Sequence, residues 1–173
     1  ADHPSALTVP LALTVIDVSD GNVTAKGREF AARCFRAGLV WGHGAKAFPR
    51  VQLLQGSPRA TAPELPDKPN KTDSKGRLLP KGVREWTVGA HKLKEMALER
   101  LATNDGGPGQ CFFADGIDAK YFEEYFNEPL IDGKFERLGP NESLDLFGYE
   151  EAARLMLKPD RASLNWSGGI LPT

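Results

Sequence analysis

The chain has 173 residues and a formal net charge of −1, with 40% hydrophobic and 26% charged residues, which is ordinary for a globular protein that buries its own core. The near-neutral charge excludes a globally basic nucleic-acid binder, although it permits a local basic patch. No apolar run approaches membrane-spanning length, and no signal-peptide pattern opens the chain. We therefore expect one domain over residues 1–173, and its opening on Ala1 instead of Met suggests a fragment.

The first half of the chain is predicted to form a strand, a helix and a second strand. Residues 10–17 are apolar and β-branched, which predicts a buried strand that ends on Asp17. Turn residues follow, then a helix over about residues 24–37. After a loop over residues 38–47, a second strand is predicted over residues 48–54. Units of this β-α-β type pack with their strands parallel.

Residues 55–83 lack hydrophobic periodicity and contain repeated Pro and Gly, which predicts a long, irregular and mobile loop. This region is rich in cations: Lys68, Lys71, Lys75, Arg77, Lys81 and Arg84. One interpretation is a solvated loop. The other is a flexible basic arm that contacts phosphates, because such contacts need only Lys and Arg on a reachable surface.

The second half alternates short strands and helices. We expect a strand over residues 84–88, a helix over 91–101, a strand over 111–114, a helix over 118–127, a hairpin over 130–138 centred on Asp132-Gly133, and a loose tail over 159–173. The alternation along the whole chain predicts an α/β layer fold.

A last helix is predicted to begin after Asn141, which is a good N-cap residue. Its core-facing stripe comprises Leu144, Phe147, Gly148, Glu151, Ala152 and Leu155. Asp145 lies beside this stripe, where a carboxylate costs several kcal/mol unless it is paired, hydrogen-bonded or coordinating a cation. Gly148, one turn further on, would let another backbone or a ligand approach closely. The alternative interpretation of Asp145 is a solvated side chain at a helix boundary.

Two acids therefore stand out: Asp17 at the end of an apolar strand and Asp145 in the last helix. Functional residues of open α/β sheets gather at the carboxyl ends of strands. If the two acids converge, a proton or a cation must relieve their repulsion, and carboxylates are the ligands that Mg²⁺ or Mn²⁺ selects. Such ions support phosphodiester hydrolysis. Glu142 and Asp20 are candidate helpers, or equally a cap and a turn residue.

A series of motifs runs along the chain. They are Val15-Ile16-Asp17 with Gly21 and Thr24, residues 52–59, residues 86–94, Gly107-Pro108-Gly109 before Phe112-Phe113, Tyr121-Phe122 with Glu128, and Asn141-Glu142-Ser143-Leu144-Asp145 with Tyr149. In this order they resemble the C-terminal nuclease domain of the large terminase subunit of lambda-type tailed phages. Two positions depart from that family's pattern, because Gln55 replaces a Lys and His91 replaces an acid.

The resemblance implies an RNase H-like fold, with a mixed sheet flanked by helices, that cuts concatemeric viral DNA with Mg²⁺ or Mn²⁺. It implies Asp17 and Asp145 as catalytic metal-binding acids, and Glu142 is our third candidate ligand. The family's first acidic strand would lie upstream of Ala1. The implied partners are double-stranded DNA, the terminase ATPase domain and small subunit, and the portal or procapsid, in the host cytoplasm and without a membrane. For DNA binding we select Lys71, Lys75, Arg77, Lys81 and Arg84.

Two alternatives remain open. The chain could be a catalytically incomplete module that docks on DNA or on a portal ring through the basic arm and the C-terminal tail. It could also be another RNase H-like enzyme, such as a resolvase or a transposase, in which case branched substrates would be preferred.

Overall fold

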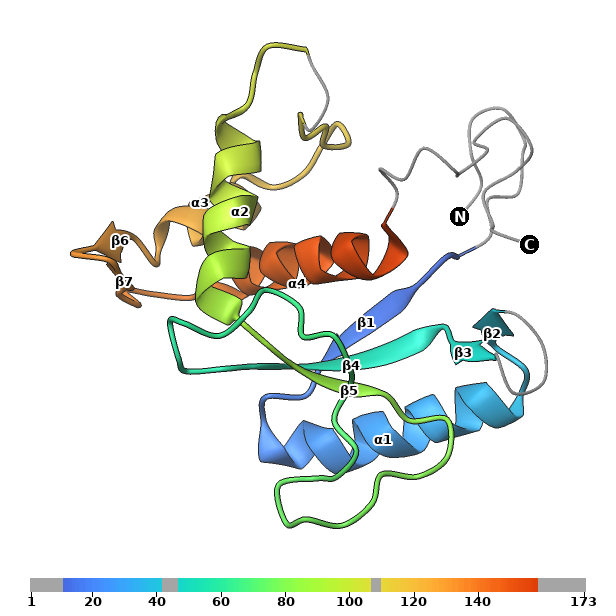
Figure 1. Ribbon diagram of the computed structural model, residues 1–173. Coiled ribbons are helices and arrows are strands. Elements are labelled where there is room, and N and C mark those ends of the chain that lie inside the picture. Colours follow the sequence, from blue (N-terminus) through green and yellow to red (C-terminus); the bar gives the residue numbers. More distant parts are fainter. Residues whose placement is uncertain (1–10, 42–46, 107–109, 159–173) are drawn as a thin grey trace.

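The computed structural model describes residues 11–41, 47–106 and 110–158 (Figure 1). The predicted tail over residues 159–173 lies outside the described residues. None of the helices in the described part of the chain is both long and apolar enough to cross a bilayer.

The centre of the fold is a parallel sheet of three strands in the order β1-β4-β5. These strands are β1 (Thr14–Asp17), β4 (Val51–Gly56) and β5 (Glu85–Val88). Asp17 lies opposite Leu54, and Leu54 lies opposite Trp86. Because the strands are parallel, Asp17, Gly56 and Val88 end at the same side of the sheet, which we call the carboxyl edge. The opposite side is the amino edge.

Helices cover both faces of this sheet (Figure 1). On one face lies α1 (Gly21–Arg36), and on the other lie α2 (Ala90–Ala102) and α4 (Glu142–Leu157), with α3 (Ala119–Phe126) packed on α4. The predicted β-α-β unit and the α/β class are confirmed, but the predicted mixed sheet is not: the three-stranded sheet of the described residues is wholly parallel, because the antiparallel pairs lie in separate hairpins. Two short antiparallel hairpins stand apart from the sheet: β2 (Val40–Trp41) with β3 (Phe48–Pro49), and β6 (Leu130–Ile131) with β7 (Lys134–Phe135).

Strand β4 is buried on both faces, which explains its continuous apolar sequence. Leu53 packs against Ala31 and Ala32 of α1, whereas Leu54 belongs to the cluster under α2 and α4. Both leucines are fully buried. A third cluster joins the last two helices through Tyr125, Leu144 and Phe147. The predicted stripe of α4 is confirmed: Leu144, Phe147, Gly148, Glu151 and Ala152 are buried.

Gly148 lies where α2 and α4 meet. A Cβ built on Gly148 would lie 3.6 Å from the backbone of Leu93 and of Lys94. The close approach predicted for this glycine is therefore an approach of another backbone.

Some predicted elements were wrong. Residues 111–114 form no strand; the Phe113 ring instead packs 5.1 Å from the Phe122 ring. The strand predicted over residues 48–54 is interrupted at Arg50, because Pro49 pairs with Val40 in the separate hairpin. The loop over residues 38–47 accordingly contains β2.

The segment over residues 57–84 is irregular, as predicted, but its backbone is bonded to the rest of the fold. The amide of Asn70 donates to the carbonyl of Glu85 at 2.7 Å, and the amide of Gly89 donates to the carbonyl of Pro63 at 2.8 Å. Loop and sheet are thus joined at both edges.

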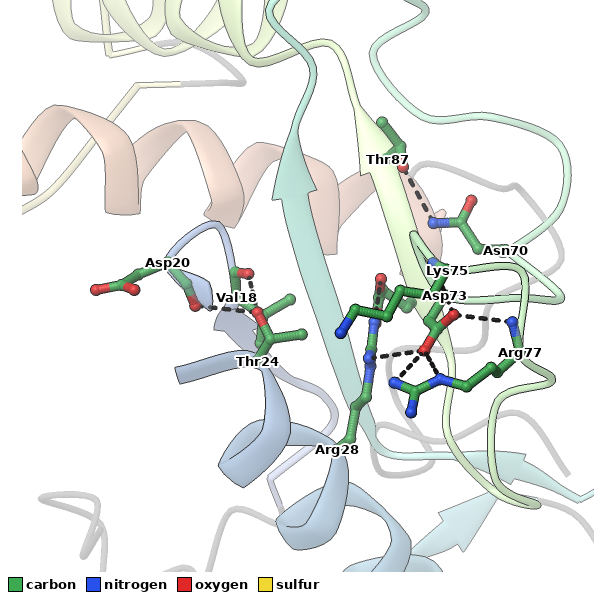
Figure 2. Close-up of polar contacts among 10 residues, drawn as sticks. Val18, Asp20, Thr24, Arg28, Asn70, Asp73, Lys75, Arg77 and Thr87 are labelled. Atoms are coloured by element: carbon green, nitrogen blue, oxygen red, sulfur yellow. Dashed lines mark hydrogen bonds and ion pairs between the residues drawn. The ribbon is translucent and has the colours of Figure 1, made fainter. Parts of the chain in front are cut away.

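A buried carboxylate, Asp73, holds the middle of this loop (Figure 2). Its Oδ1 accepts from the amides of Lys75 and Arg77, both at 2.9 Å. Its Oδ2 lies 2.7 Å from the Arg77 guanidinium and 3.8 Å from that of Arg28. Arg28 of α1 also donates two hydrogen bonds to Glu85 of β5, at 2.8 and 3.0 Å. The Arg77 amide bond first, and then its guanidinium, lower the pKa of Asp73 to about 2. Loop, helix and strand therefore share one ionic network.

Candidate active site

The carboxyl edge of the sheet presents the first predicted acid. Asp17 ends β1, is exposed, and accepts a 2.8 Å hydrogen bond from the amide of Ser19 through Oδ1. Asp20 is the N-cap of α1, because its side chain accepts from the amide of Asn22 at 2.8 Å. The interpretation of Asp20 as a structural residue is thus confirmed. Thr24 supports the same turn, as its hydroxyl donates to the carbonyl of Val18 at 2.9 Å (Figure 2).

Tyr149 of α4 connects this edge to the second acid. Its hydroxyl lies 3.2 Å from the hydroxyl of Ser19, whose oxygen accepts from the amide of Gly56 at 3.3 Å. Burial raises the pKa of Tyr149 to about 12, and the negative charges of Asp17 and Asp145 both act in the same direction. Asp17 is linked to this hydroxyl through Ser19, and Asp145 lies one helical turn before Tyr149 in α4. Tyr149 therefore connects the end of β1 with the helix that carries the second acid.

Asp145 is paired with a buried lysine of α2. Its Oδ1 lies 2.6 Å from Nζ of Lys94, a residue that is 8% exposed. The same ammonium contacts the Glu128 carboxylate, which also accepts from the Asn141 side-chain amide. An ion pair is one of the ways in which a carboxylate beside a buried face becomes tolerable. Of the three possibilities considered for Asp145, the structure shows an ion pair, although a third of its side chain remains exposed.

The start of α4 is capped differently from the prediction. Asn141 occupies the N-cap position but makes no capping hydrogen bond with its side chain. Glu124 of α3 instead accepts from the amide of Ser143 at 3.0 Å and from its hydroxyl at 2.8 Å. These bonds lower the pKa of Glu124. In the described part of the chain, Oδ1 of the buried Asn141 has no hydrogen-bond partner.

Glu142, the third candidate ligand, lies in the first turn of α4. Its side chain is 71% exposed and lies 3.4 Å from the Arg137 guanidinium. Its role in metal binding stays a prediction. Among the described residues, no group of three or more His, Cys, Asp or Glu is arranged to hold a metal ion.

The five candidate DNA-binding residues are divided by the structure. Lys71, Lys81 and Arg84 line one hollow of about 740 Å³, together with Lys68; we call this the basic groove. Arg77 is bound to Asp73, and the amide of Lys75, in the same turn, also donates to Asp73. The groove lies at the amino edge, because Arg84 directly precedes β5.

The roles of Lys94 and Glu128 were not predicted from the sequence, although Lys94 lies within residues 86–94 and Glu128 follows Tyr121-Phe122. A local signal existed for Lys94, which follows the fully buried Leu93 and precedes Ala97 on the apolar face of α2. Nothing local indicated that its partners would be Glu128 and Asp145, which come from distant parts of the sequence.

Comparison with curated proteins and with solved structures found no match. Comparison with protein families found one described as "Terminase large subunit gpA, endonuclease domain", which matches residues 1–166. The match spans almost the whole chain, including the strand that ends on Asp17 and the helix that carries Asp145. The chain therefore belongs to the family of terminase large subunit gpA endonuclease domains, whose role is that of a nuclease in phage DNA packaging.

Proposed function

We propose that this chain is a nuclease domain of RNase H-like fold that hydrolyses phosphodiester bonds of concatemeric viral DNA with Mg²⁺ or Mn²⁺, and that Asp17 and Asp145 hold the metal. The observation that carries the proposal is the 3.2 Å contact between the hydroxyls of Tyr149 and Ser19, because the Ser19 amide also binds Asp17 and Tyr149 lies one helical turn after Asp145 in α4. A parallel sheet followed by a helix that returns an acid to its carboxyl edge is consistent with this assignment.

The oxygens available at the site fit a hard divalent cation. Asp17 and Asp145 each use Oδ1 for an interaction within the described part of the chain, with the Ser19 amide and the Lys94 ammonium. No described hydrogen bond or ion pair engages Oδ2 of either residue. Carboxylate oxygens are the ligands that Mg²⁺ and Mn²⁺ prefer. Glu142 is proposed as a further, more exposed ligand.

The residues of the chain would perform distinct tasks. The bound metal would supply Lewis-acid stabilisation of the phosphate oxygens and a more acidic water. Asp17 and Asp145 would hold their oxygens in fixed directions, because each is tied by its other oxygen. The hydroxyls of the neutral Tyr149 and of Ser19 lie 3.2 Å apart and would orient water or a phosphate oxygen by hydrogen bonding.

The test is nicking of a supercoiled plasmid with added Mn²⁺. The wild-type chain should nick, and Asp17→Asn and Asp145→Asn should each abolish nicking while leaving the fold intact. Asp115→Asn is the matched control, because Asp115 is exposed and lies in the segment before α3. Full activity in both Asp17→Asn and Asp145→Asn would rule out this site.

The basic groove supports a second candidate, a packaging-motor module that docks on DNA or the portal without cutting. Duplex binding without nicking at any Mn²⁺ or Mg²⁺ concentration would favour it. In either case we propose that the chain works in the host cytoplasm as one domain beside the terminase ATPase domain, with the small subunit and the portal as further partners.

A further inference from the structure

The basic groove concentrates positive charge, and its described lining contains no acidic side chain. Four basic side chains line it: Lys68, Lys71, Lys81 and Arg84. None of the described lining residues is acidic. Within the described part of the chain, none of these four cations belongs to an ion pair. By contrast, the neighbouring Arg28 and Arg77 are bound to Glu85 and Asp73. Four unpaired cations of this part of the chain therefore line one groove.

The walls of the groove are built into the fold. Gly82 has a φ of +84°, and a Cβ at this position would lie 2.2 Å from Cγ of Phe35 in α1. The loop backbone thus lies directly on that ring, and the ionic network of Asp73 holds another part of the same loop (Figure 2). Cations displayed on a bonded backbone lose less conformational entropy on binding than cations on a free arm.

The groove is separated from the candidate active site by the length of the sheet. Arg84 precedes the first residue of β5, whereas Asp17 ends β1, and Ser19 meets Tyr149, at the opposite, carboxyl edge. A strand rises about 3.3 Å per residue, so the four residues of β5 alone span about 13 Å. Duplex DNA rises about 3.4 Å per base pair along each strand, so this length corresponds to about four base pairs.

We propose that the basic groove binds the phosphate backbone of duplex DNA at a point flanking the cut, about four or more base pairs from the scissile phosphate. It would act as a sequence-independent grip that keeps the duplex aligned across the sheet while the carboxyl edge engages the bond to be cut. Its position relative to the cut rests on the proposed function, but its binding of DNA does not.

The experiment measures binding of a fluorescent duplex by anisotropy in EDTA, where cleavage is not expected, between about 50 and 200 mM salt. The test variant is Lys71→Ala/Lys81→Ala, and the control is Lys26→Ala/Lys120→Ala, which removes the same charge from exposed lysines of α1 and α3. Loss of two phosphate contacts should reduce the slope of log affinity against log salt by about 1.8 and weaken binding more than about tenfold at 0.1 M salt. The control should keep most of the wild-type slope.

Two outcomes separate this proposal from the nuclease assignment. If the test variant binds DNA with the same slope and affinity as the control, the basic groove does not bind DNA. That result would leave the nuclease assignment, which is judged by Mn²⁺-dependent nicking, unchanged. If the wild-type chain never nicks but the test variant shows a reduced slope, the nuclease assignment is wrong and the DNA-binding proposal for the basic groove holds.

Combining the test variant with Asp145→Asn tests whether the basic groove and the candidate active site contact different phosphates. If the groove and the active site touch different phosphates, the two fold-changes in DNA affinity should multiply. A clear departure from that product would place both on one phosphate and contradict a flanking grip.

Discussion

Substitution of Lys94 should show how much more a buried ion pair stabilises this fold than an exposed one does. Its ammonium contacts Asp145 and Glu128, and the side chains of Lys94 and Glu128 are only 10% and 12% exposed. Lys94→Met retains most of the aliphatic stem and removes the charge, so two carboxylates lose their shared cation. Removing one partner of a buried pair costs about 3–5 kcal/mol. Because a third of Asp145 is exposed to water, we expect the lower end, about 3 kcal/mol.

Lys92→Met is the matched control in the same helix. Lys92 lies 3.3 Å from Glu64, and the two side chains are 39% and 40% exposed. Exposed pairs contribute less than about 1 kcal/mol, because water screens them. Urea unfolding followed by tryptophan fluorescence should therefore show a difference of about 2 kcal/mol or more between the variants. In thermal melts, Lys94→Met should lower Tm by about 6–12 °C.

Equal costs for Lys94→Met and Lys92→Met would refute the idea that the buried ammonium stabilises this site. A double-mutant cycle with Glu128→Gln provides a second check. Since Lys94 and Glu128 are in contact, their effects should not add. Additive effects would mean that the contact contributes nothing.

Two further predictions concern the loop that forms the basic groove. Gly82→Ala should destabilise the fold far more than Gly76→Ala in urea titrations: both glycines have positive φ, but only at Gly82 would the new Cβ meet another side chain, that of Phe35. Equal effects would show that the loop does not rest on this ring. For Asp73, whose pKa is lowered to about 2, the stabilisation is complete above pH 4 and is lost as pH falls from about 4 through 2, because protonation ends its ion pairs. Asp73→Asn should thus be less stable than wild type at neutral pH, and acid titration should bring the two together; a constant difference down to pH 2 would contradict this reasoning.

Several features of the fold follow from short stretches of sequence. Asp132 and Gly133 both adopt positive φ, at 47° and 74°, as an Asp-Gly turn between two strands requires. The buried stripe of α4 appears because apolar residues recur at helical spacing. In each case the determining residues lie within a few positions of each other, so local conformation and one-sided burial decide the outcome.

Other features could not be read locally. Residues 111–114 have the composition of a strand, but none of the described strands pairs with them, and Phe113 packs on α3 instead. Asn141 has the residue type of a helix cap, yet Glu124 from another helix satisfies the first turn of α4. Here a long-range partner prevailed over a local preference.

The sequence by itself determined the parallel β-α-β core, the amphipathic last helix and the choice of Asp17 and Asp145 as unusual acids. Only the tertiary structure decided that Lys94 neutralises Asp145, that Tyr149 meets Ser19 beside Asp17, and that four cations of the loop line a groove at the amino edge. The physical reason is that hydrogen bonding and periodicity act between near neighbours in the chain. The neutralisation of a half-buried charge instead depends on which distant helices and strands the packing of the core brings together.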